Sequence, residues 1–100
     1  MITEAYRYRF RQGADLRQAE DTLLLAILAA EGLYGEACIR MDAGYAIDES
    51  IRAIVVDAST EVGQAVNGIF TSFLLKEFGR LGFHVRRVEG VGSDVRGDAR

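Results

Sequence analysis

The sequence is poor in the residues from which cross-links and metal sites are made. Its 100 residues include one cysteine, Cys38, and one histidine, His84. A single cysteine cannot form a disulfide within the chain, which fits a reducing compartment. A metal site needs several cysteine, histidine or carboxylate ligands close together, and the pattern offers none. We therefore expect no internal disulfide, no metal and no other cofactor.

Long apolar runs are also missing. The longest, Leu23 to Ala30, has eight residues, whereas a helix that spans a bilayer needs about 20. The first ten residues, MITEAYRYRF, lack the basic and apolar regions of a signal peptide. We expect a cytoplasmic protein that is not anchored in a membrane.

Sequence signatures of catalysis are absent as well. The glycine-rich segments GVGSD and EGLYGE do not stand between a strand and a helix, as a phosphate-binding loop does. The best remaining place for a ligand is the end of the predicted sheet near Asp57, Ser59 and Thr60, where free helix amides could hold an anion. We expect no catalytic or cofactor-binding residue, and an enzyme of unknown reaction is the weaker alternative.

What the sequence does contain is typical of one globular domain. Hydrophobic residues make up 49% of the chain and charged residues 27%, with no low-complexity tract. The formal net charge is −3, which disfavours nucleic acid as a partner.

Hydrophobic periodicity predicts six secondary-structure elements. Alternating apolar and polar residues indicate strands, and a 3.6-residue repeat indicates helices, with Asp15 and either Ser59 or Thr60 as N-caps. The short turn DES joins two strands into an antiparallel hairpin. The expected elements are a strand at 5–11, a helix from 15 to the glycines at 32 and 35, strands at 36–48 and 51–58, a helix at 59–79 and a strand at 83–89.

This order, βαββαβ, resembles the ferredoxin-like superfold in topology, without a motif of any particular family. The resemblance implies an α+β sandwich in which four antiparallel strands stand in the order 4-1-3-2 and both helices cover one face. The domain would occupy residues 1–89. Residues 90–100 are rich in glycine and polar residues, and we expect them to form a disordered tail.

The sheet face without helices is expected to gather basic residues. If Tyr6, Tyr8 and Phe10 face the helices, their arginine neighbours face the other way. The third strand would add Arg52, Ile54 and Val56, or their neighbours. The candidate interaction face consists of Arg7, Arg9, Arg40, His84 and Arg86, with Cys38 beside them.

The apolar run in the first helix exceeds what the core requires. Leu16, Leu23 and Ile27 fall on the core stripe, whereas Leu24, Leu25 and Leu28 do not. We interpret these three leucines as a candidate apolar contact. For Leu24 and Leu28 the favoured interpretation is that the two helices bury each other's flanks, with these leucines packed against Phe70 and Leu74. This interpretation does not cover Leu25.

A non-catalytic interaction or assembly module acting as a homo-oligomer is therefore the favoured function, with a homodimer or another protein as partner. The alternative is anion or RNA binding by the arginine-rich sheet face. RNA is disfavoured because the strand IRAIVVDA offers no aromatic side chain on which a base could stack.

Overall fold

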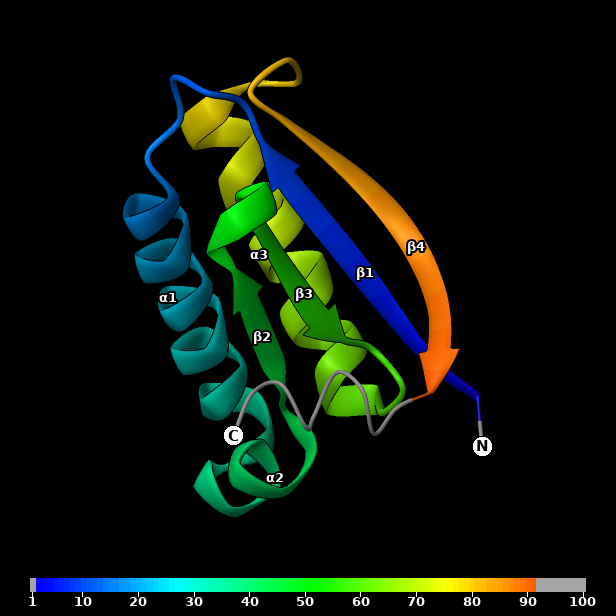
Figure 1. Ribbon diagram of the computed structural model, residues 1–100. Helices are drawn as coiled ribbons and strands as arrows, with labels where there is room; N and C mark the ends of the chain where they lie inside the picture. Colours follow the sequence, from blue (N-terminus) through cyan, green and yellow to red (C-terminus); the bar gives the residue numbers. More distant parts are fainter. Residues whose placement is uncertain (1, 92–100) are drawn as a thin grey trace.

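Four strands form one antiparallel sheet, and two long helices cover one of its faces (Figure 1). The computed structural model describes residues 2–91. The strand order is β2-β3-β1-β4, so the α+β architecture with a four-stranded antiparallel sheet is confirmed. The elements are β1 (Ile2–Phe10), α1 (Leu16–Tyr34), α2 (Glu36–Asp42), β2 (Tyr45–Asp48), a 3-10 turn (Glu49–Ile51), β3 (Ala53–Asp57), α3 (Glu61–Phe78) and β4 (Phe83–Val91).

The core lies between the sheet and the pair α1 and α3. Tyr8 and Phe10 of β1 are buried, as alternation in this strand predicts. The Tyr8 ring meets Phe70 of α3 edge-on, with ring centroids 4.8 Å apart. From the first helix, Leu23 is completely buried in the same cluster. The cluster also holds Ile54 and Val56 of β3 and Val62, Val66 and Leu74 of α3.

Both long helices begin at the predicted caps. The Asp15 carboxylate accepts a hydrogen bond from the backbone N–H of Arg17, and the Thr60 hydroxyl accepts one from Gly63. Helix α1 ends at Gly35, whose φ of 87° is readily adopted only by glycine. These local signals therefore set where both helices that cover the sheet begin and where α1 ends.

A third helix replaces most of the predicted second strand. Residues 36–42 form α2, and β2 contains only Tyr45–Asp48. Within α2 only Ile39 packs against the core, while Glu36 and Arg40 form an ion pair one helical turn apart at 3.0 Å. The expectation of two helices and a long second strand was wrong here.

The two long helices pack through small and polar side chains. Ala19, Ala26 and Ala30 of α1 are buried. The Thr22 hydroxyl donates to the Glu77 carboxylate of α3, and Gln18 donates to its second oxygen at 3.2 Å. The interpretation in which the helices bury each other's flanks was right for Phe70 and Leu74 and wrong for Leu24 and Leu28. Phe70 and Leu74 lie in the core, and Leu24 and Leu28 remain exposed.

The C-terminal strand runs antiparallel beside β1 along its whole length. It extends to Val91, which pairs with Ile2. The predicted disordered tail lies, from residue 92 on, outside the described residues.

Candidate functional site

The open face of the sheet carries basic residues in two adjacent rows. Arg7 of β1 stands directly opposite Arg86 of β4, and Arg9 stands opposite His84. Their inward neighbours Tyr8 and Phe10 pair with Val85 and Phe83, which pack against the core. The structure therefore brings together four of the five residues of the candidate interaction face.

The fifth residue, Arg40, does not belong to this face. It lies on α2 with Cys38, because residues 36–42 are helical and never enter the sheet. Both side chains are exposed, and Arg40 is paired with Glu36. The placement of Arg40 and Cys38 beside the strand arginines was wrong.

The third strand presents the neighbours of the expected residues to the open face. Val55 pairs with Arg7, and Ala53 pairs with Arg9. Ile54 and Val56 point into the core instead. Arg52 precedes the strand, where its guanidinium donates to the carbonyl of Arg11 at 3.1 Å and to that of Ala14.

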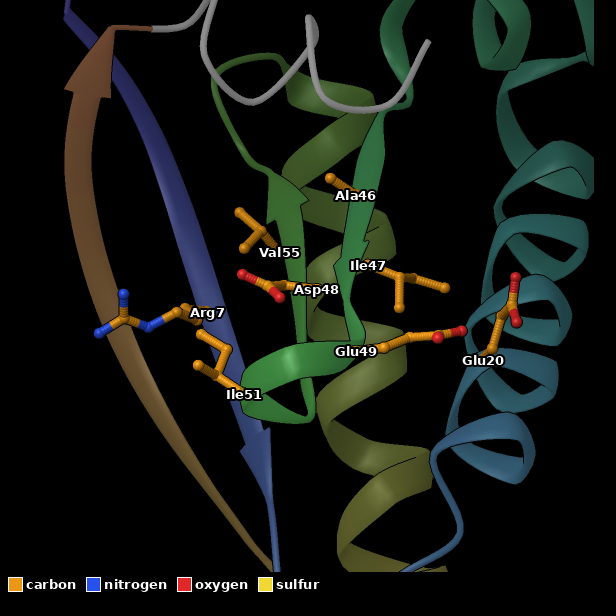
Figure 2. Close-up of a pocket in the computed structure, with 8 residues that line it drawn as sticks. All are labelled: Arg7, Glu20, Ala46, Ile47, Asp48, Glu49, Ile51 and Val55. Atoms are coloured by element: carbon orange, nitrogen blue, oxygen red, sulfur yellow. The ribbon is translucent and has the colours of Figure 1, made fainter.

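One hollow bends around the edge strand β2 and has a volume of about 680 Å³ (Figure 2). Figure 2 shows Arg7 and Asp48 on the open side of the sheet, whereas Glu49 points toward Glu20 of α1. Hydrogen bonding by Ser50 lowers the pKa of Asp48. The carboxylates thus lie on two sides of a strand, which does not suit a catalytic pair acting on one substrate. The lining residues are Arg7, Glu20, Ala46, Ile47, Asp48, Glu49, Ile51 and Val55.

A second hollow, of about 390 Å³, lies where the end of β1 meets the start of β4. We call it the basic hollow. Arginine and histidine side chains alternate with apolar ones in its wall, and none of its lining residues is acidic. Arg9 and His84 extend the rows of the open face into it, while Arg80 comes from the turn after α3. Its lining is Arg9, Phe10, Arg11, Arg80, Leu81, Phe83 and His84.

Sequence reasoning missed the contribution of Arg80. Strand alternation predicted that the Arg11 side chain points outward. Arg80 lies in a turn, where alternation does not predict which way a side chain points. The one available signal was the pair of glycines Gly79 and Gly82, which predict a tight connection and hence a short distance between Arg80 and the start of β4.

The three leucines of the candidate apolar contact are exposed. The exposed fractions of Leu24, Leu25 and Leu28 are 46%, 58% and 62%. We call these three residues of α1 the leucine patch. Leu33, near the end of the helix, is 77% exposed but lies about 140° around α1 from Leu28. Met41 of the neighbouring α2 is also exposed.

The end of the sheet near α3 is occupied by the chain's own groups. The Asp57 carboxylate accepts hydrogen bonds from the backbone N–H and hydroxyl of Ser59, at 2.9 and 2.6 Å. The Thr60 hydroxyl caps Gly63 and donates to the Asp42 carbonyl at 3.0 Å. Hydrogen bonds from the chain's own side chains thus already fill the place at the start of α3 where the sequence suggested that an anion could bind.

Within the described residues, no three histidine, cysteine or carboxylate side chains are placed to hold a metal ion together. No helix in residues 2–91 combines the length and the apolar character needed to cross a membrane. Comparisons of the chain with protein-family models, with curated proteins and with solved structures found no match.

Proposed function

We propose that this chain is a non-catalytic assembly module that pairs with a second copy of itself through the leucine patch. The observation that carries the proposal is the exposure of Leu24, Leu25 and Leu28, three leucines on one helix, at 46%, 58% and 62%. The outer face of a surface helix is normally polar. A second copy would remove this apolar area from water, which contributes about 25 cal/mol per Å² toward offsetting the entropy cost of association.

The charge pattern of α1 supports a contact in the middle and C-terminal turns of the helix. From Thr22 to Ala30 the helix contains no charged residue. Arg17 and Asp21 keep the first turns polar and exposed. Ala29 and Gly32, beside the leucines, are exposed small residues, and small residues let another helix approach closely. This arrangement of an apolar centre with a polar rim is typical of protein interfaces.

A second copy fits the patch because the pattern is self-complementary. In an antiparallel crossing with its two-fold axis between Ala26 and Ile27, Leu25 faces Leu28 of the other copy, and Leu24 faces Ala29.

We further propose that the module has the ferredoxin-like arrangement, with α2 added between α1 and β2, and that it acts in the cytoplasm. Read from the β4 edge, the sheet order is β4-β1-β3-β2, which supports the arrangement. The single exposed cysteine, Cys38, supports a reducing compartment.

Sedimentation velocity tests the assembly. We expect the wild-type chain to form a dimer at micromolar concentration and Leu28→Asp to be a monomer with unchanged circular dichroism, since residue 28 is exposed in the free chain. Leu81→Asp is the matched control, because Leu81 is 76% exposed but lies in the turn after α3. A wild-type monomer at all concentrations would refute the proposal. Loss of the dimer on Arg9→Glu, with Leu28→Asp still dimeric, would move the contact to the open sheet face.

A further inference from the structure

The basic hollow has a chemical character that the proposed assembly does not use. We infer that it binds the phosphate group of a small phosphorylated molecule. Three guanidinium groups and one imidazole, from Arg9, Arg11, Arg80 and His84, line a volume of about 390 Å³. The hollow belongs to the sheet and the turn after α3, whereas the leucine patch lies on α1.

The three guanidinium groups of the hollow lack anionic partners in the described part of the chain. The ion pairs between described residues join Arg40 to Glu36 and Arg87 to Glu4, and neither pair lies in the hollow. Arg9 stands beside the facing pair Arg7 and Arg86, and like charges directly opposite each other destabilise a sheet. An anion bound at Arg9 would offset part of this positive charge.

The rim of the hollow is held in place by backbone contacts. The Arg11 N–H donates to the Gly82 carbonyl at 3.2 Å, which ties the loop after β1 to the turn before β4. The Arg52 guanidinium holds the Arg11 carbonyl from the other side. A side chain at Gly82 would place a Cβ 2.4 Å from the Phe78 carbonyl oxygen, so this tight turn requires glycine. Because these contacts already fix the loops, binding does not have to order their backbone.

A phosphate monoester matches both the charge and the apolar part of the wall. It carries a charge of about −1.5 to −2 and three acceptor oxygens, and guanidinium groups bind such oxygens in pairs. Phe10, Phe83 and Leu81 supply apolar surface for the organic part of the molecule. A long nucleic acid fits less well, because it would extend from this small hollow over a chain with fifteen acidic residues.

Titration with phenyl phosphate, followed by amide chemical shifts and calorimetry at constant ionic strength, tests the inference. We expect saturable binding, with shifts centred on residues 9–11 and 80–84. Arg11→Gln and Arg80→Gln, both at exposed positions, should each weaken binding by about tenfold, the loss of one charge-assisted hydrogen bond. Arg17→Gln is the matched control, an exposed arginine on α1, and it should bind like the wild type.

Inorganic phosphate and vesicles that contain phosphatidic acid distinguish the sources of the phosphate group. Weaker binding of inorganic phosphate than of phenyl phosphate would support a role for the apolar wall. Retention on the vesicles alone, lost in Arg80→Gln, would mean that a lipid presents the phosphate. No saturable binding of any probe, equal weakening by Arg17→Gln, or tight binding of an RNA pool in its place would overturn the inference. None of these outcomes depends on whether the chain dimerises.

Discussion

Tyr8 carries a polar group into the centre of the core. The side chain is completely buried, and its hydroxyl bonds to the Asn67 side chain and, at 2.7 Å, to the Thr71 hydroxyl. Asn67 and its neighbour Gly68 lie in the middle of α3, and both residue types are poor helix formers. The structure shows that Asn67 is a partner for the buried hydroxyl, a role that its sequence position alone does not reveal.

Burial raises the pKa of Tyr8 to about 12, from 10.0. Because the folded state holds this proton more tightly, the associated stability is complete below pH 10 and is lost as the pH rises toward 12. The loss should reach about 2–3 kcal/mol. Tyr8→Phe should lower the free energy of unfolding by about 1 kcal/mol at neutral pH. The stability of the variant should fall less steeply than that of the wild type as the pH rises, and urea unfolding at several pH values would measure this. Parallel pH profiles for the two proteins would contradict this prediction.

Arg52 adopts a backbone conformation that favours glycine, with φ 52°. Its guanidinium bonds to two carbonyls of the loop after β1. Arg52→Ala and Arg52→Gly both remove these bonds, but only alanine keeps the left-handed strain. We therefore expect the glycine variant to be more stable than the alanine variant by about 1–2 kcal/mol. Thermal unfolding of both would measure the difference, and the reverse order would contradict the prediction.

At the scale of an element, α3 contains two glycines with opposite requirements. A Cβ at Gly63 would lie 2.2 Å from the Asp57 carbonyl oxygen, whereas a Cβ at Gly68 would meet nothing within 4 Å. Gly68→Ala should stabilise the protein by about 0.5–1 kcal/mol. Gly63→Ala should destabilise it by about 1–3 kcal/mol because the helix must move off β3. Each variant is the control for the other in chemical denaturation, and a similar effect of both would show that the close contact at Gly63 is unimportant.

Most elements could be predicted because their periodicity was long enough to be unambiguous. The alternation in β1 is clear from Tyr6 to Phe10. The cap of α1 was identified as Asp15, and that of α3 as Ser59 or Thr60, of which Thr60 is the cap. The seven residues of α2 were misinterpreted because EACIRMD satisfies both periods. Apolar residues at 37, 39 and 41 alternate, but a helix of this length needs only Ile39 on its inner side. Tertiary contacts decide whether such a short segment becomes a helix or a strand.

Over the whole molecule, positive charge is concentrated on one sheet face although the net charge is −3. Arg86→Glu would convert the repulsion with Arg7 into an attraction, so we expect a gain of about 0.2–1 kcal/mol at low salt. The gain should shrink as salt screens the pair. Arg86→Gln, which only removes the charge, should be intermediate. Urea unfolding at two salt concentrations would check this order, and a loss of stability in Arg86→Glu would contradict it.

The candidate surfaces could be predicted to the extent that they depend on strand alternation or helical spacing. Arg7, Arg9, His84 and Arg86 follow from alternation in two strands that pair in register. The exposure of Leu25 follows from its angle on α1. Arg40 was misplaced with its strand, and Arg80 enters the basic hollow only through the geometry of a turn. Turns and short helices depend on contacts distant in sequence, which single-sequence patterns do not contain.

The strand order leaves β4 at one border of the sheet and the four-residue β2 at the other. A nine-residue border strand offers a row of backbone groups to which strands of other molecules can add, the first step of fibrillar aggregation. Exposed polar and charged side chains lie along that border: His84, Arg86 and Arg87. The arginines of β4 therefore have a protective consequence that is independent of any ligand: they repel an approaching copy of the same strand and so oppose edge-to-edge aggregation.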